Sequence, residues 1–129
     1  MRSAAAVRCS CGTGLPYAGC CGPFHDGAPA PTAEQLMRSR YTAFARGLPS
    51  YLLETWHPST RPRTLVLDPA QEWLGLQVLE ARGGFLDTEG VVEFRATWRQ
   101  RGGTEVLHER SRFVREDGRW LYVSALVRS

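Results

Sequence analysis

The sequence predicts an α+β protein in which an N-terminal four-cysteine metal module precedes helices packed on a curved antiparallel sheet. Three observations predict this class. The cysteines crowd into residues 9–21, apolar residues recur at helical spacing between residues 32 and 56, and the apolar period becomes that of strands after Pro62. Helices followed by a run of hairpin-connected strands favour a helical layer on one face of a sheet. We expect a metal module at residues 1–27 and an α+β domain at residues 28–129.

The four cysteines have the spacing C-x-C-x8-C-C, and the predicted metal ligands are Cys9, Cys11, Cys20 and Cys21. A close pair and an adjacent pair, separated by a glycine-containing turn, can place four thiolates around one tetrahedral ion. Zinc is the default ion for such a site and iron the second candidate. Disulfides are the alternative, but a bond between adjacent cysteines would be strained, and the crossed pairings would close a very small knot. A redox pair would need C-x-x-C on a βαβ unit, which the sequence lacks.

A metal in this module would have a structural role. Between residues 9 and 27 the sizeable apolar side chains are Leu15, Tyr17 and Phe24, too few to form a core in so short a segment. Metal binding would supply the folding free energy instead, and four protein ligands would leave no coordination position for a substrate. His25 is a possible substitute ligand, although a hydrogen-bonding role beside the ligands is the simpler expectation.

Local signals place the helices. Residues 22–31 are rich in Pro, Gly and Ala and predict a linker. Thr32, with Gln35 at the reciprocal position of a capping box, begins a helix that Gly47 ends. The segment 49–56 predicts a second, shorter helix.

Strands follow from residue 64 onward. The predicted strands are 64–67, 72–80, 91–99, 106–115 and 119–127, of which the second could begin as a helical turn. The segment 91–99 is the clearest, because apolar and polar residues alternate along it as in a strand with one buried face. Gly102-Gly103 and Glu116-Asp117-Gly118 predict the turns between the last three strands.

Composition excludes several classes of function. All 16 basic residues are arginine, but 13 acidic residues are present and the arginines near the C-terminus are interleaved with acids. A nucleic-acid interface normally shows a stripe of one sign, so we do not expect nucleic-acid binding. No apolar run approaches the length of a membrane span, and the apolar part of the first seven residues is too short for a signal peptide. We expect a cytoplasmic protein, because thiols stay reduced there.

Residues 9–22, CSCGTGLPYAGCCG, resemble the zinc motif at the C-terminus of the SecA translocation motor. The whole chain resembles the YchJ family, which joins that motif to a nuclear-transport-factor-2-like, cystatin-like domain. The other matching stretches are APAPTAEQLMRSRYTAF at 28–44, YLLETWHPSTRP at 51–62, WLGLQVLE at 73–80 and LHERSRFVREDGRWLYV at 107–123.

The resemblance implies zinc, with iron as an alternative, and docking of the motif on an export chaperone. The sequence departs from the usual motif at several positions. Ser10 and Thr13 replace Pro and Ser, Leu15-Pro16 replaces a basic pair, and Cys21 stands where histidine is common. The basic face that would meet an acidic chaperone is therefore reduced.

The resemblance also implies a sheet that curls around a helix and leaves a pocket at its open end. The pocket candidates are Arg40, Tyr41, Trp56, His57, His108, Glu109 and Arg112, with the remaining tryptophans as further walls. Glu109 and Arg112 lie on opposite faces of their strand, and neither face is purely apolar. A buried Arg40–Glu109 pair is a structural alternative to a functional pocket, and His57 has a structural alternative as a cap for helix carbonyls.

Two functions follow as hypotheses. The first is a metal-stabilised adaptor that binds a protein partner, either an export chaperone or the ribosome, through the cysteine module. The alternative is small-molecule binding or enzymatic activity in the pocket of the α+β domain. We assign no catalytic residue and favour the adaptor over an enzyme. A homodimer is a further possibility for this fold.

Overall fold

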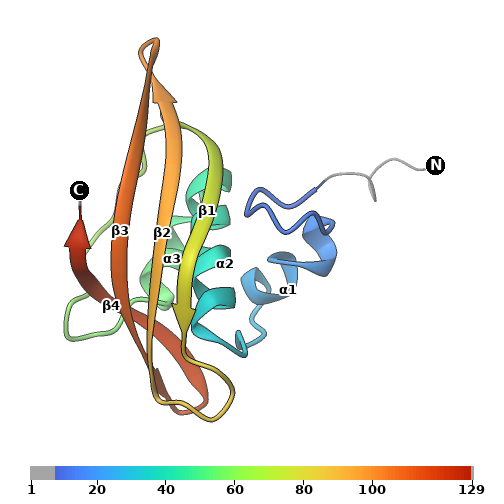
Figure 1. Ribbon diagram of the computed structural model, residues 1–129, viewed down its shortest axis with the longest axis vertical. Coiled ribbons are helices and arrows are strands. Elements are labelled where there is room, and N and C mark those ends of the chain that lie inside the picture. The colour runs from blue at the N-terminus through green and yellow to red at the C-terminus, as the bar shows by residue number, and fades with distance from the viewer. Residues whose placement is uncertain (1–7, 129) are drawn as a thin grey trace.

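The computed structural model describes residues 8–128, so the first seven residues, on which the signal-peptide expectation rested, lie outside the described part. The elements are a 3-10 turn η2 (Tyr17–Gly19), α1 (Gly22–His25), α2 (Ala33–Arg46), α3 (Pro49–Glu54), β1 (Glu72–Arg82), β2 (Glu89–Gln100), β3 (Gly103–Glu116) and β4 (Arg119–Arg128). The strands form one antiparallel sheet in the order β1-β2-β3-β4 (Figure 1). The predicted α+β class is confirmed.

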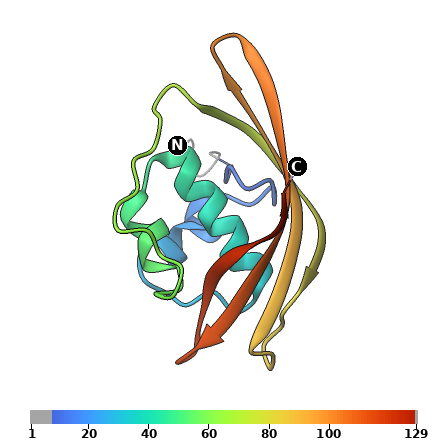
Figure 2. The same cartoon turned by 90° about the vertical axis from the view of Figure 1, so that its left-hand side faces the viewer.

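The helices lie together on the concave face of the sheet, as Figure 2 shows. Register shifts interrupt the ladders within β1 and within the pairing of β3 with β4. Such bulges bend a strand and increase its twist, which accounts for the curl of the sheet around α2. Because the sheet curls, its inner face and α2 enclose the space in which the pocket lies.

The ends of α2 follow the sequence signals. The backbone N–H of Gln35 donates to the Thr32 hydroxyl at 3.2 Å, which satisfies one of the open donors of the first turn. Gly47 adopts a left-handed conformation, with φ 72°, and ends the helix as predicted. The buried face of α2 includes Arg40, the arginine expected on its apolar side.

The core joins both parts of the chain. Val92, Phe94, Ala96 and Phe113 cover the inner face of the sheet, and the alternation predicted for residues 91–99 is confirmed. Cys9, Cys11 and Cys21 belong to the same buried cluster as the apolar residues of α2. The cysteine module therefore packs directly on the α+β domain.

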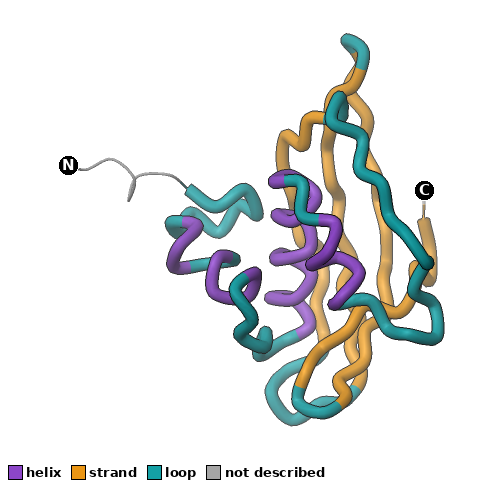
Figure 3. The backbone as a smooth tube through the Cα atoms, turned by 180° about the vertical axis from the view of Figure 1, so that it is seen from behind, coloured by secondary structure: helices purple, strands orange, loops and turns teal. Residues whose placement is uncertain are grey.

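Two predicted elements are wrong, and one turn is displaced. Residues 64–67 form no strand; Val66 is 90% exposed, and the segment runs in the loop beside the helices that links α3 to β1 (Figure 3). The predicted linker at 22–31 begins instead with α1, where Pro23 occupies the first turn and needs no hydrogen-bonded N–H. The turn before β3 uses Arg101-Gly102, both with positive φ, rather than Gly102-Gly103.

The structure also tests the second predicted helix and the predicted start of the strand at residue 72. Residues 49–54 are helical, which confirms most of the segment expected at 49–56. The strand from residue 72 is extended from its first residue, without a helical turn.

Among residues 8–128, no helix combines the length and the apolar character needed to span a bilayer.

Candidate functional site

The four cysteine sulfurs converge on one point. The Sγ atoms of Cys9, Cys11, Cys20 and Cys21 all lie within 4.8 Å of one another, and those of Cys11 and Cys20 are 3.5 Å apart. Zn–S bonds of about 2.3 Å at tetrahedral angles place sulfurs about 3.8 Å apart. The residues therefore fit a tetrahedral metal ion with four thiolate ligands.

Glycines and backbone hydrogen bonds shape the first part of this site. The backbone N–H of Cys9 donates to the Leu15 carbonyl at 2.8 Å, which closes a tight loop around the C-x-C pair. Gly12 and Gly14 have φ of 89° and 84°, a region that side chains disfavour. The sequence places glycine at both positions, so the loop can return without strain.

Two threonine hydroxyls contact the sulfurs. Thr13 Oγ1 lies 3.1 Å from Cys20 Sγ, and Thr42 Oγ1 of α2 lies 3.5 Å from Cys9 Sγ. Toward a metal-bound thiolate each hydroxyl would act as the donor, which stabilises the negative charge on sulfur. Sequence reasoning missed Thr42, because 33 residues separate it from Cys9 and only the fold brings them together.

Three of the four thiols have pKa values that their neighbours and their burial shift strongly. A hydrogen bond from Cys21 lowers the pKa of Cys11 to about 4, whereas burial raises the pKa of Cys20 to about 11. The pKa of Cys21 is raised chiefly because its thiol donates that bond to Cys11. Burial and the Cys11 thiolate thus disfavour ionisation of Cys20 and Cys21, and a divalent cation is the partner that would favour their thiolate forms.

His25 fastens the module to α2 instead of joining the sulfurs. Its Nε2 donates to the Ser39 carbonyl at 2.8 Å, so Nδ1 of the neutral ring accepts from the Tyr17 hydroxyl at 2.7 Å. The ring also packs edge-on against Tyr51. Burial lowers the pKa of His25 and favours this neutral form. The expectation of a hydrogen-bonding neighbour is confirmed.

Two arginines of α2 reach the module, and neither was among the sequence candidates. Arg38 Nη1 donates to the Cys11 carbonyl at 2.7 Å. The Cζ atom of Arg46 lies 3.8 Å from the centroid of the Tyr17 ring, a cation–π contact. Arg46 is exposed, so it returns positive charge to a surface where the sequence has Leu15-Pro16 instead of a basic pair.

A second site lies between α2 and the inner face of the sheet. It is a cavity of ≈ 330 Å³, within the range typical of small-molecule sites. Its walls combine one face of α2 with inward residues of all four strands and two loop residues. The residues that line it are Met37, Arg40, Tyr41, Phe44, Trp56, Gln71, Trp73, Phe94, Ala96, Trp98, Leu107, Glu109, Ser111, Phe113 and Tyr122.

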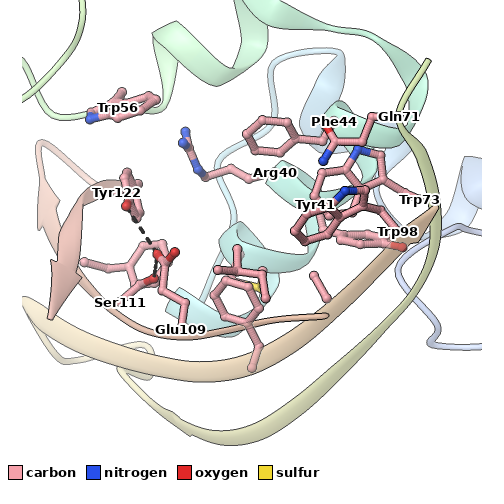
Figure 4. Close-up of a pocket in the computed structure, with 15 residues that line it drawn as sticks. Arg40, Tyr41, Phe44, Trp56, Gln71, Trp73, Trp98, Glu109, Ser111 and Tyr122 are labelled. Carbon is pink, nitrogen blue, oxygen red and sulfur yellow. Dashed lines mark hydrogen bonds between the residues drawn. The ribbon is translucent and has the colours of Figure 1, made fainter. Parts of the chain in front are cut away.

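Four predicted pocket residues line this cavity, namely Arg40, Tyr41, Trp56 and Glu109 (Figure 4). Arg40 and Glu109 are both buried, but Tyr122 mediates between them in place of the direct pair that we expected. The Arg40 guanidinium lies 4.6 Å from the Tyr122 ring centroid, and the Tyr122 hydroxyl donates to Glu109 Oε2 at 3.3 Å. Burial lowers the pKa of Arg40 to about 10, and attraction to Glu109 opposes that shift.

The other three candidates do not line the cavity. His57 pairs through Nε2 with Glu116 at 2.9 Å, so the expected capping of helix carbonyls is wrong. His108 pairs with Glu93 at 2.7 Å and belongs to an ion-pair network that Arg110 extends to Glu80. Arg112 alternates with the buried Ser111 and Phe113 and is directed away from the cavity.

Trp120, expected as a pocket wall, is buried elsewhere. Its Nε1 donates to the Pro31 carbonyl at 3.2 Å and ties β4 to the segment before α2. Sequence reasoning missed nine of the lining residues, among them Phe44, Gln71 and Tyr122. The helical spacing of Phe44 with Arg40 was the available signal for the first of these.

Residues 32–125 match the family described as YchJ, middle NTF2-like domain. A UPF0225 protein of Chromobacterium violaceum is 54% identical over 129 residues, which cover 95% of each chain. A UPF0225 protein of Streptomyces coelicolor is 58% identical over 116 residues, which cover 88% of this chain and 90% of the relative.

Two solved structures of SEC-C motif containing proteins have the same fold. The solution structure of a SEC-C motif containing protein from Rhodopseudomonas palustris has a TM-score of 0.80 at 35% identity, over 92% of this chain and 97% of that one. The crystal structure of a SEC-C motif containing protein from Psychrobacter arcticus has a TM-score of 0.77 at 29% identity, over 96% and 84%.

Proposed function

The chain belongs to the YchJ (UPF0225) family, and we propose that it is a zinc-stabilised adaptor that binds a protein partner through its cysteine module. The convergence of four cysteine sulfurs carries this proposal. A metal ion held by four protein ligands has no open position for water or substrate, so its role is to hold the surrounding loop in shape. That loop is exposed at residues 12–15, where a partner can reach it.

Zinc is the proposed ion, because tetrahedral four-sulfur sites suit it and four thiolates are the ligands present. Iron suits the same ligands, and its thiolate complexes are coloured whereas those of zinc are not. Elemental analysis of the protein purified without added metal should therefore find zinc at one equivalent per chain. The proposal also places the protein in the cytoplasm, where thiols stay reduced and available to metal.

The exposed surface of the module suggests what the partner offers in return. Leu15 is 51% exposed where the loop closes. Arg8, which pairs with Pro16, and Arg46, which lies over the Tyr17 ring, are also exposed. A partner surface with an apolar pocket and an acidic rim would complement this combination. We propose an export chaperone with such an acidic surface, and we treat binding to the ribosome as the competing outcome.

A matched pair of variants tests the adaptor. Leu15 on the module and Leu126 on β4 are equally exposed, at 51%, and they lie in parts of the molecule on opposite sides in Figure 1. The chain carrying Leu15→Ser should keep its zinc and lose the purified chaperone in a pull-down, whereas Leu126→Ser should keep both. If ribosomes bind the protein and the chaperone does not, the ribosome is the partner. Binding that survives Leu15→Ser and the Cys→Ser replacement of all four ligands would overturn the adaptor.

The cavity supports small-molecule binding as a second candidate function. Its volume of ≈ 330 Å³ and its mixture of aromatic walls with buried Arg40 and Glu109 are the observations that favour it. This function would be independent of the module surface, so the two candidates can hold together.

A further inference from the structure

Two aromatic clusters face one another across the cavity, and Figure 4 shows them at its two ends. At one end Trp73 packs against Tyr41, Phe44 and Trp98, with ring centroids 5.4–5.8 Å apart. At the other end Trp56 and Tyr122 meet edge-on at 5.1 Å. A flat apolar body between these clusters would contact ring faces and edges at both ends.

Arg40 is the cation at the second of these clusters. It is 6% exposed, and its Cζ atom lies 5.2 Å from the Trp56 ring centroid. Its Nη1 donates to the Leu52 carbonyl at 2.8 Å and to Thr55 Oγ1 at 2.7 Å. Both hydrogens of Nη1 are therefore used. Within the described part of the chain, no hydrogen bond of Arg40 involves Nε or Nη2.

The unused donors are accessible from the cavity. Within residues 8–128, Trp56 Nε1 is the side-chain donor that is both sealed from solvent and without a hydrogen-bond partner. The remaining N–H groups of Arg40 are not sealed in this way, and Arg40 lines the cavity. Nε and Nη2 form one edge of the guanidinium, and two parallel N–H groups on such an edge match the two oxygens of a carboxylate.

The loss of water around the Arg40 charge, rather than a net charge of the pocket, favours an anionic ligand. Burial lowers the pKa of Arg40 to about 10, which leaves the group protonated at neutral pH but poorly solvated. Glu109 is directed toward Ser111 and Tyr122, whose hydroxyls both donate to its Oε2. It therefore attracts Arg40 without taking up the Nε and Nη2 edge. Burial deprives the Arg40 guanidinium of hydrogen bonds to water. An anionic ligand at the Nε and Nη2 edge would replace them with charge-assisted hydrogen bonds.

We propose that this cavity binds a small aromatic or heteroaromatic carboxylate, its ring between the two aromatic clusters and its carboxylate on the Nε and Nη2 edge of Arg40. The inference rests on the second candidate function and names the ligand class for it. A cavity of ≈ 330 Å³ restricts the body of the ligand to one or two fused rings.

Matched ligands test the proposal on the unaltered protein. The zinc-loaded full chain is titrated by calorimetry with benzoate, phenylacetate and indole-3-acetate, with the amide of each acid, and with acetate. At least one aromatic acid should bind on the order of tenfold more tightly than its amide, because the amide replaces a charge-assisted pair with neutral hydrogen bonds. Acetate should not saturate the site. Equal affinities of acid and amide, or no binding by any aromatic acid, would overturn the proposal.

Variants then locate the site. Arg40→Lys keeps the charge but cannot form the bidentate pair of hydrogen bonds to a carboxylate. The affinity for the acid should therefore fall about tenfold, while the affinity for the amide is unchanged. Ala96→Leu fills the cavity and should abolish binding of both, and Arg112→Lys, on the other face of the sheet, should alter neither. Should Arg40→Lys fail to fold, the ligand pairs still decide the question. The Leu15→Ser chain keeps the cavity, so failure of the adaptor and failure of this site are separable.

Discussion

At the scale of single residues, the hydroxyls of Thr13 and Thr42 are the least conspicuous parts of the candidate metal centre. Four thiolates around a divalent ion carry a net charge of −2, and a buried charge of that size needs hydrogen-bond donors. Thr42 is fully buried on α2 and contacts Cys9, so it supplies such a donor from outside the cysteine module.

Replacing Thr42 with Val should weaken metal binding about tenfold, the lower end of the effect of removing an outer hydrogen bond from a metal ligand. Valine has nearly the shape of threonine, so packing is conserved and the lost hydroxyl is the main change. Competition against a chelator of known affinity measures the effect. Thr42→Ser keeps the hydroxyl and serves as the control; an equal loss in both variants would assign the effect to packing.

His25 makes a different contribution, which depends on pH. Its folded-state pKa lies below the ordinary value of 6.5 because burial disfavours the charged ring. Its contribution to stability is therefore complete above pH 6.5. It is lost as the pH falls toward the folded pKa, because the unfolded chain then binds a proton that the folded chain does not. The slope from this group cannot exceed about 1.4 kcal/mol per pH unit.

His25→Gln removes that titration while its amide keeps a donor for the Ser39 carbonyl. Urea unfolding at pH 7.0 and pH 5.5 should show a smaller loss of stability for the variant than for the wild type. Contributions from the cysteines are common to both proteins and cancel in the difference. Identical losses would show that His25 does not titrate differently in the folded and unfolded chains.

At the scale of elements, α2 was predictable from local signals because its cap at Thr32 and its stop at Gly47 lie within the helix sequence itself. The alternation of residues 91–99 predicted β2 for the same reason. Contacts between distant segments were not predictable. Arg46 on Tyr17, and Tyr122 between Arg40 and Glu109, depend on how the elements pack.

The two wrong predictions, the strand at 64–67 and the linker at 22–31, also arise because a local pattern does not show how a segment packs. Branched apolar residues at 64–67 satisfy strand propensity, but a strand also needs a neighbour to pair with, and the segment lies in the loop that leads to β1. The Pro- and Gly-rich composition at 22–31 suggested a linker, yet one turn of helix fits because Pro suits the first turn. The spacing of the cysteines predicted that their four sulfurs would converge, and they do.

Metal removal should act on elements unequally. A chelator should abolish hydrogen-exchange protection across residues 8–27, because that segment has few apolar residues of its own. The amides of α2 should exchange faster but remain partly protected, because the helix keeps its packing on the sheet. The exchange rates of β2 and β3 should be unchanged. Restored protection after the removed metal is returned is the control. Equal acceleration across β2 and β3 would mean that the metal supports the whole fold.

At the scale of the whole molecule, the helical layer is joined to the sheet where the β1–β2 connection meets the start of α2. The N–H of Ala33 donates to the Gly83 carbonyl at 3.0 Å. A Cβ atom at Gly90 would lie 2.6 Å from the Arg82 carbonyl oxygen and 2.8 Å from the Ala33 side chain. The two layers approach closely there because the glycine has no side chain.

Gly90→Ala should therefore destabilise the protein by about 1–3 kcal/mol, the usual cost of forcing a methyl group into a filled site. Gly75→Ala is the matched control, since it is also a strand glycine but a Cβ atom there would meet nothing within 4 Å. Thermal or urea unfolding of the two variants measures the difference. Similar stabilities would show that the junction can widen without cost.

The position of α2 between the two candidate sites has a thermodynamic consequence. Arg40 and Tyr41 line the cavity, and the next residue, Thr42, contacts a cysteine of the metal centre. Any ligand that prefers the metal-loaded position of this helix would raise metal affinity, and by reciprocity the metal would raise ligand affinity by the same factor. Through one turn of this helix, the occupancy of the cavity would then depend on the metal concentration around the protein.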